Sequence, residues 1–218
     1  MKPYKQIWET IAEEIKEGVI NGRYKPEERL KEAELAKKYA VSKTPVREAL
    51  RYLESIGFVE IVPHTMARVK KMNHREVVDL YLIQSVLEGL AAREAVAHLE
   101  DDDYQNMENL ATLLEKHSLE KNSSEYEKAN IKFHAIFWKA CGNEKLKEMI
   151  GNIHEQLLRF RSVTRRYPER FKDLAADHRK IYDAALKKDA ARIEGLFRNH
   201  VERQTKYIVD ILKKENHI

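Results

Sequence analysis

The sequence lacks the features that would place it outside the cytoplasm. It has a single cysteine, Cys141, so its 218 residues contain no disulfide framework. It has no secretory apolar segment and no apolar run near the roughly 20 residues that a membrane helix needs. We therefore expect a cytoplasmic protein that makes no membrane contact.

The usual catalytic patterns are missing as well. The chain has no Gly-rich phosphate loop, no Ser/His/Asp constellation and no pair of carboxylates that stands out as catalytic. No repeat or low-complexity segment occurs either. These absences argue against an enzyme. One enzyme class stays open as an alternative, because three histidines with an open position are also how catalytic zinc sites are built.

The formal net charge of +4 lies in the first third of the sequence. Residues 1–73 hold 15 Lys and Arg against 11 Asp and Glu, which leaves 25 of each sign for residues 74–218. This asymmetry suits a small module that docks on phosphate next to a larger one that does not. The length agrees with two modest domains, since single domains average roughly 100 to 200 residues.

A proline stands at the start of a helical pattern in VSKTPVREAL, residues 41–50. Proline is tolerated at the first helical position, so we expect Thr44 to cap a helix that begins at Pro45. Arg47 and Arg51 then lie on an exposed basic side of this helix. The apolar residues that recur at helical spacing form its buried side: Val46, Ala49, Leu50 and Leu53.

The flanking segments complete a winged helix. Residues 29–40 read as a short helix that only a three-residue turn separates from the Thr44 cap, which predicts a helix-turn-helix. Residues 7–20 carry an apolar stripe every four residues, typical of an amphipathic helix. After the second helix, two β-prone runs flank residues 63–66, as in a hairpin. The stripe consists of Ile7, Ile11, Ile15 and Val19.

The first 70 or so residues resemble the GntR superfamily of bacterial transcription regulators. The family's VSRTPVREAL is matched with one substitution, Lys43 for Arg, while Ala40 and Glu27 stand where glycine is usual, and the wing lacks its usual glycine. Other shared positions are Gly22, Pro26, Leu30, Leu35, Ala36, Leu53 and Gly57. The resemblance implies a repressor-like homodimer on a two-fold symmetric double-stranded DNA operator. The residues expected to bind DNA are Ser42, Lys43, Thr44, Arg47, Arg51 and, in the wing, His64.

The rest of the chain reads as helices only. Asn73 can cap a first helix, and further helices are expected at about 101–120, 124–141, 144–166, 169–187 and 190–214. The predicted fold is therefore mostly α. It consists of a winged helix-turn-helix over residues 1–72 and an all-α antiparallel helical bundle over 73–218.

Histidines stand out within the expected bundle. Asn130 and His134 lie four residues apart on one helix face, and His178 and His200 lie on the last two helices. Imidazoles from three helices can converge inside a bundle and suit Zn, Ni, Cu or Fe. Spacing alone does not separate this from three histidines that merely pack in the core, which is the more frequent case.

Residues 74–214 resemble the FCD ligand-binding domain of the FadR branch of the same regulators. The shared marks are Leu87 to Ala92, Asn130 to His134, Cys141 to Asn143, His178, Asp189 and His200. The resemblance implies a divalent metal, Zn or Ni, bound by His134, His178 and His200, with Asn130 in place of the family's Asp. Asp189 is expected to cap a helix instead of binding the metal.

The same resemblance implies an effector site next to the metal, and the charge of the expected ligands indicates a small organic acid as the effector. Three neutral imidazoles and a neutral amide leave a divalent ion with its full charge, which favours a carboxylate at the open positions. Gln84, where the family often has a pocket Arg, and Arg159 or Arg161 are candidate effector contacts; either arginine could equally lie on a solvated helix face. A ligand-responsive DNA-binding regulator accounts for both halves of the chain. The alternatives are a metal-dependent enzyme and a DNA-binding architectural protein with an inert helical domain.

Overall fold

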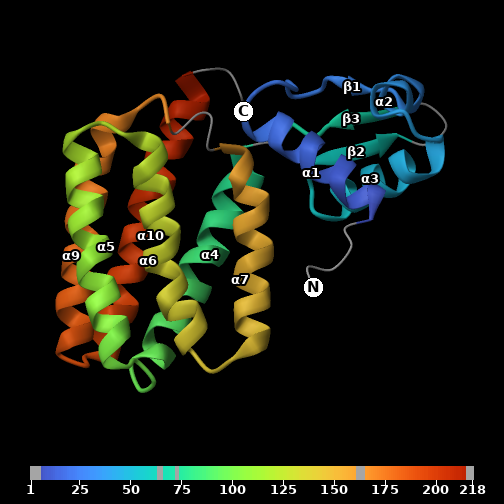
Figure 1. Ribbon diagram of the computed structural model, residues 1–218. Coiled ribbons are helices and arrows are strands. Elements are labelled where there is room, and N and C mark those ends of the chain that lie inside the picture. The colour runs from blue at the N-terminus through green and yellow to red at the C-terminus, as the bar shows by residue number, and fades with distance from the viewer. Residues whose placement is uncertain (1–5, 63–65, 72–73, 161–164, 215–218) are drawn as a thin grey trace. The chain divides into compact units, whose positions relative to one another are not determined.

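The computed structural model describes residues 6–62, 66–71, 74–160 and 165–214. Over these residues the chain is mostly helical, with one small antiparallel sheet, and it divides into two compact units (Figure 1). The first unit takes in residues 6–71 together with 155–160, and the second takes in 74–154 and 165–214. Within the described part of the chain, no helix is both long and apolar enough to cross a membrane.

The first unit is the predicted winged helix with one additional strand. Its strands pair in the antiparallel order β1-β3-β2, with Ile61 opposite Ala67 in the hairpin. Strand β1 was not expected, since residues 29–40 read as one helix; instead Leu30 pairs with Ala67 and the helix starts after it. In chain order the elements are α1 (Ile7–Ile20), β1 (Arg29–Leu30), α2 (Glu32–Tyr39), α3 (Lys43–Ser55), β2 (Val59–Val62) and β3 (Met66–Val69).

The apolar side of α3 is buried as predicted, and this fixes which side faces outward. All four of its apolar positions lie in the core of the first unit. The stripe of α1 is only partly buried: Ile11 and Ile15 lie in the core, but Ile7 is 59% exposed. Ile7 belongs to the first turn of α1, one turn before Ile11, the first buried residue of this helix.

Helix α3 begins two residues earlier than the proline suggested. Its N-cap is Ser42 and not Thr44, so Pro45 is the third helical residue. Pro45 does not mark the first helical residue, because the first N–H groups of a helix all lack an intrahelical partner and a proline at any of these positions loses no hydrogen bond. The Ser42 side chain makes no capping hydrogen bond and remains exposed.

Ala40 ends α2 in the left-handed conformation, with a φ of 53°. This backbone costs a residue with a Cβ roughly 1 kcal/mol or more relative to glycine. We predict that Ala40→Gly raises the free energy of unfolding by about 1 kcal/mol, measured by urea denaturation. Ala33→Gly, at an exposed position inside α2, is the matched control and should lower it by about 0.5–1 kcal/mol. A loss of stability in Ala40→Gly would contradict the assigned backbone.

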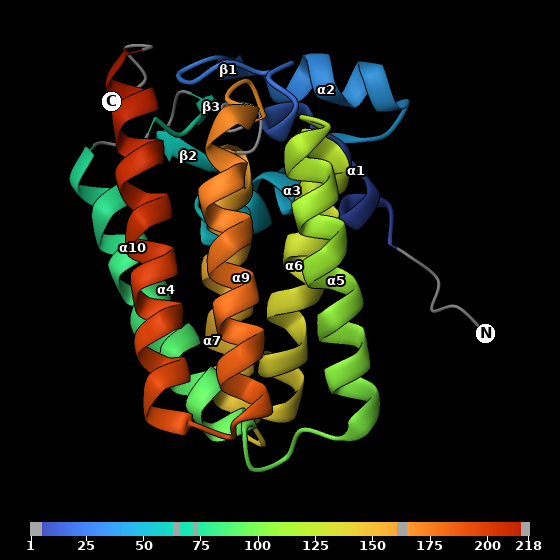
Figure 2. The same cartoon turned by 90° about the vertical axis from the view of Figure 1, so that its left-hand side faces the viewer.

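The second unit is an antiparallel helical bundle. Successive helices alternate in direction, α10 packs along α4 and α9, and α5 packs along α6 and α9 (Figures 1 and 2). The bundle elements are α4 (His74–Ala95), α5 (Asp101–Leu119), α6 (Ser123–Ala140), α7 (Glu144–Leu157), η2 (Pro168–Arg170), α9 (Phe171–Leu186) and α10 (Ala190–Lys214). The 3₁₀ turn η1 (Leu158–Phe160) follows α7 in the chain and belongs to the first unit.

The predicted helices agree with these bounds except for one. The helix expected over 144–166 ends at Leu157 and tightens into the 3₁₀ turn η1. The expected cap Asn73 lies outside the described residues. Asp189 does cap α10, since its Oδ1 accepts a hydrogen bond of 3.0 Å from the backbone N–H of Arg192.

Helices α4 and α10 approach closely at Gly89. A Cβ at this position would lie 3.0 Å from Cγ of Arg198 and 3.2 Å from the carbonyl oxygen of Glu194. The missing side chain therefore lets the two backbones come together. Glu88 and His200 lie next to this contact in sequence, on the buried sides of α4 and α10.

Candidate metal centre and DNA-binding helix

Three helices bring the predicted histidines together in the interior of the second unit. His134 on α6, His178 on α9 and His200 on α10 are 2%, 0% and 1% exposed. One ligand atom from each lies within 4.8 Å of the others. The burial is set by the apolar faces around them, since Phe133 packs edge-on against the ring of His178 and Phe197 against that of His134.

The hydrogen bonds of two rings fix which nitrogen carries the proton. Nδ1 of His134 lies 2.5 Å from Oε2 of Glu88, and Nδ1 of His178 lies 2.7 Å from the carbonyl oxygen of Leu174. A carboxylate and a carbonyl oxygen only accept, so both Nδ1 atoms carry hydrogen. In the neutral rings both Nε2 atoms then present lone pairs.

These two Nε2 atoms face each other at 3.2 Å. Two lone pairs at this distance repel unless a proton or a cation lies between them. Two nitrogens that bind one tetrahedral Zn²⁺ at about 2.0–2.1 Å lie about 3.3–3.4 Å apart. The spacing fits a shared metal ion, and each ring also has the outer hydrogen-bond acceptor that metal-binding histidines have.

His200 faces a second buried carboxylate. Its Nδ1 lies 3.8 Å from Oδ2 of Asp177, and neither atom has a hydrogen bond among the described residues. Burial lowers the pKa of His200, and it lowers the pKa of His178 well below its ordinary value. Both rings are therefore held neutral, the form that binds metal.

Glu88 is the functional residue that the sequence reading did not assign. Its carboxylate is 0% exposed and accepts from three donors: His134, the Nε2–H of His154 at 2.8 Å, and the side-chain amide of Gln84 at 2.6 Å. Burial alone would raise the pKa of Glu88, but the imidazoles of His134 and His154 outweigh it and hold that pKa far below its usual range. Glu88 and Gln84 lie four residues apart in an apolar helix. Two polar residues on one face of such a helix indicate a buried polar site, so the sequence contained a signal for Glu88.

The predicted effector contacts and the predicted fourth metal ligand, Asn130, lie in different parts of the structure. Gln84 is buried and bonds to Glu88. Asn130 is half-buried one turn before His134 on α6. Arg159 lies in the first unit, where its guanidinium stands over the ring of Phe58 at 5.1 Å. Arg161 lies outside the described residues. The ligand role of Asn130 and the effector roles stay predictions.

The N-terminal end of α3 is open and basic. Ser42, Lys43, Thr44, Arg47 and Arg51 are all exposed. Nε of Arg47 donates to Oε2 of Glu32 at 2.8 Å, and among the described residues its two terminal nitrogens make no hydrogen bond. Glu32 therefore orients the guanidinium and leaves its fork free. The expected wing contact His64 lies outside the described residues.

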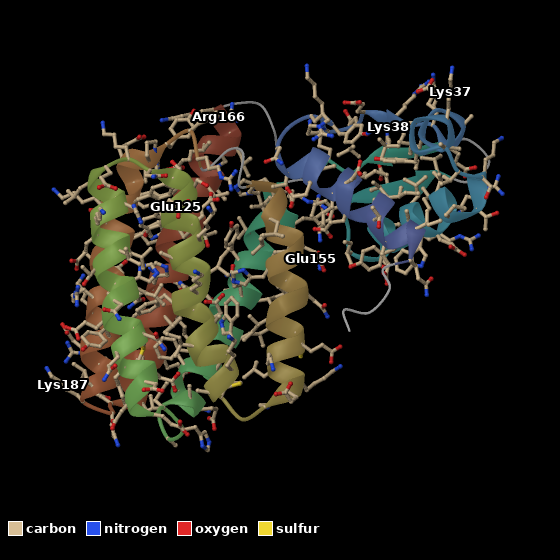
Figure 3. All side chains as sticks on the ribbon, in the orientation of Figure 1. Lys37, Lys38, Glu125, Glu155, Arg166 and Lys187 are labelled. Atoms are coloured by element: carbon tan, nitrogen blue, oxygen red, sulfur yellow. The ribbon has the colours of Figure 1, made fainter. Side chains whose placement is uncertain are left out.

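Two more lysines extend this basic surface onto the preceding helix. Lys37 and Lys38 lie exposed on α2 (Figure 3). Nζ of Lys38 lies 3.2 Å from the hydroxyl oxygens of Tyr24 and Tyr39, which raises its pKa and holds the ammonium in place.

A winged helix with an open basic helix, followed in the chain by a bundle with a buried polar cluster, is the build of a ligand-responsive DNA-binding transcription regulator. The chain belongs to the gntR family of bacterial regulatory proteins, in the group that carries an FCD domain. Residues 7–69 match the gntR family and residues 79–203 match the FCD domain.

Several known regulators are similar to this chain over most of its length. The chain is 25% identical to the HTH-type transcriptional regulator YdhC of Bacillus subtilis, covering 93% of this chain and 92% of YdhC. It is 27% identical to the HTH-type transcriptional repressor GlaR of Escherichia coli, covering 86% and 89%. The fold matches the solved structure of E. coli McbR/YncC with a TM-score of 0.78 at 20% identity, covering 95% and 99%. The chain is thus a regulator and not an enzyme.

Proposed function

We propose that the helical unit binds one divalent metal ion, Zn or Ni, and a small carboxylate effector that modulates operator binding. The observation that supports the metal most strongly is the pair of Nε2 atoms, of His134 and His178, that face each other at 3.2 Å while both Nδ1 atoms are engaged. Imidazole nitrogen suits these metals. When bound, the ion supplies a positive centre at which a carboxylate can replace water.

The buried carboxylates refine the charge argument made from the sequence. The ligands expected from the sequence are all neutral, but Glu88 lies against His134 and Asp177 faces His200. The charge of Glu88 offsets part of the ion's charge. Asp177 contributes less, because it already pairs with Lys180 at 3.3 Å and with Arg203 at 3.5 Å. The site therefore favours a small anion over a highly charged one, and monocarboxylates or compact dicarboxylates are the effectors that fit best.

For DNA, we propose that α3 enters the major groove of a double-stranded operator. Ser42, Lys43 and Thr44 lie at its N-terminus, where backbone N–H groups and the helix dipole favour phosphate. Arg47 and Arg51 face the same open side and supply guanidinium groups that suit guanine. The protein would act as a repressor-type regulator in the cytoplasm.

A homodimer on a two-fold operator completes this proposal, since one winged helix reads few base pairs. Helix α4 offers a surface for a second copy. Three large apolar side chains on it, Leu82, Ile83 and Val86, are 54%, 46% and 40% exposed, although they face away from the core of their own unit. Apolar side chains gathered in this way mark an interaction site more often than a solvated face.

We predict that Ile83→Glu converts the dimer to a monomer at micromolar concentration, because a carboxylate would be placed twice in an apolar interface. Light scattering after size exclusion gives the mass. Leu186→Glu, at an apolar position that is 51% exposed at the end of α9, is the matched control and should leave the mass unchanged. A monomeric wild type would contradict the proposed assembly.

Calorimetry tests the proposed switch. Acetate, lactate, succinate and citrate are titrated into wild type, into wild type with chelator and into His134→Ala. We expect the acid to bind only to the metal-loaded wild type, and DNA affinity to change only when the acid binds. The size of that change is limited by how much more tightly the acid binds one conformation of the protein than the other. Equal acid binding in all three samples would show that the metal is no part of the switch.

A further inference from the structure

Two of the three clustered histidine rings have a hydrogen-bond acceptor behind the nitrogen that points away from the cluster. Nδ1 of His134 donates to Glu88, and Nδ1 of His178 donates to the carbonyl oxygen of Leu174. These bonds fix the tautomer and leave the lone pair of each Nε2 for an ion. Nδ1 of His200 is buried and has no hydrogen-bond partner among the described residues. Its tautomer is therefore not set by a bond of this kind.

The atom that faces Nδ1 of His200 is a carboxylate oxygen. Oδ2 of Asp177 lies 3.8 Å away, and this oxygen also lacks a hydrogen bond among the described residues. The distance exceeds the length of a hydrogen bond, so the two atoms face each other without being joined. Leaving a buried donor and a buried acceptor unpaired is costly, which favours a small shift that joins them. That bond would give His200 the outer acceptor that the other two rings already have.

The packing of α9 against α10 places Asp177 at this ring. Asp177 comes directly before His178 on α9, and successive side chains of a helix differ in direction by about 100°. The two side chains therefore point to different neighbours. Helix α10 runs along α9 and brings His200 to Asp177 (Figure 2). Helix α9 thus carries one of the three histidines and also the carboxylate that faces another.

Two cations keep the carboxylate of Asp177 ionised. Nζ of Lys180 lies 3.3 Å from its Oδ1, and Nη1 of Arg203 lies 3.5 Å from its Oδ2. Asp177 is 6% exposed, whereas the side chains of Lys180 and Arg203 are 56% and 43% exposed, so the cations lie at the surface and the carboxylate lies beneath them. An ionised carboxylate only accepts hydrogen bonds. Asp177 therefore favours the form of His200 that carries its hydrogen on Nδ1.

We propose that Asp177 is a positioning residue of the metal centre, which holds the hydrogen of His200 on Nδ1 and so presents the Nε2 lone pair to the ion. The rings of His134 and His178 are set by their own bonds before an ion binds, and His200 is the ligand that Asp177 brings into place. The inference rests on the proposed function. It adds a residue that does not touch the ion and acts on it through one ring.

The experiment uses the full-length protein and two measurements. Long-range proton–nitrogen NMR spectra of isotope-labelled, metal-free protein show which nitrogen of a histidine carries the hydrogen, and the signals of His200 are those missing from His200→Ala. Calorimetry with Zn²⁺ gives the metal affinity. Asp177→Ala removes the acceptor, and Asp177→Leu replaces that variant if it does not fold. Asp183→Ala, at an exposed position of the same helix, is the matched control. Arg203→Ala removes an ion pair of Asp177 and keeps its carboxylate.

We expect the hydrogen of His200 on Nδ1 in wild type and on Nε2 in Asp177→Ala. Zn²⁺ affinity should fall by about 10- to 100-fold in Asp177→Ala and stay unchanged in Asp183→Ala and Arg203→Ala. Three results would overturn the inference: hydrogen on Nε2 of His200 in wild type, an unchanged tautomer in Asp177→Ala, or wild-type Zn²⁺ affinity in Asp177→Ala. No Zn²⁺ binding by wild type would instead contradict the proposed function, and the role of Asp177 in a metal centre would fall with it.

Discussion

His178→Ala is expected to abolish the stabilisation that Zn²⁺ gives to the wild-type protein. At a free metal concentration of 1,000 times the dissociation constant, a ligand that binds only the folded state stabilises it by about 4 kcal/mol. His178 is the most informative ligand to remove, because its outer bond goes to Leu174 of its own helix and leaves the bonds of Glu88 intact. The unfolding temperature with and without Zn²⁺ measures the effect.

The control for this experiment is His98→Ala, which removes an exposed histidine outside the cluster and should keep the full Zn²⁺ shift. His178→Ala will lose some stability without metal too, because its ring is fully buried. The difference between metal-loaded and metal-free samples separates the two effects. An unchanged Zn²⁺ shift in His178→Ala would mean that the metal binds elsewhere.

Arg47→Ala should weaken DNA binding by about 5- to 150-fold, which corresponds to the roughly 1–3 kcal/mol of a bidentate arginine contact with guanine. The variant should fold normally, since Arg47 is exposed and its ion pair with Glu32 is of the surface type that contributes about 1 kcal/mol at most. Fluorescence anisotropy on a duplex selected by wild type gives the affinity.

Two further variants make this result specific. Arg47→Lys keeps the charge but loses the fork, so it should retain phosphate attraction and lose base preference. Arg23→Ala removes an exposed arginine outside α3 and should change the affinity little. Unchanged affinity and base preference in Arg47→Ala would remove this residue from the DNA-binding surface.

The sequence was sufficient for the parts of the fold that rest on periodicity. The apolar spacing of α3 identified all four of its core residues, and the helix over 190–214 was found with its bounds and its Asp189 cap. The caps and ends of helices were harder to predict from the sequence. A proline tolerates several places in the first turn, and nothing local shows that the helix from Glu144 tightens into a 3₁₀ turn after Leu157.

The candidate site also contains residues that the sequence predicted and residues that it did not. The three histidines were predicted because each is an unusual residue on an apolar helix face, and the resemblance joined them. Glu88 and His154 were not assigned, because their importance comes from a contact 66 residues apart in sequence. Nothing in the helix pattern around Arg159 reveals that its guanidinium lies over Phe58. Contacts between distant segments are what the sequence alone does not supply.

X-ray absorption at the zinc edge, on protein loaded with Zn²⁺ and then desalted, tests the central claim most directly. The account predicts one ion per chain with three imidazole nitrogens at about 2.0–2.1 Å and the remaining positions filled by oxygen. Less than about one ion per ten chains after loading, or a spectrum with fewer than two imidazole ligands, would contradict a metal centre built on His134, His178 and His200.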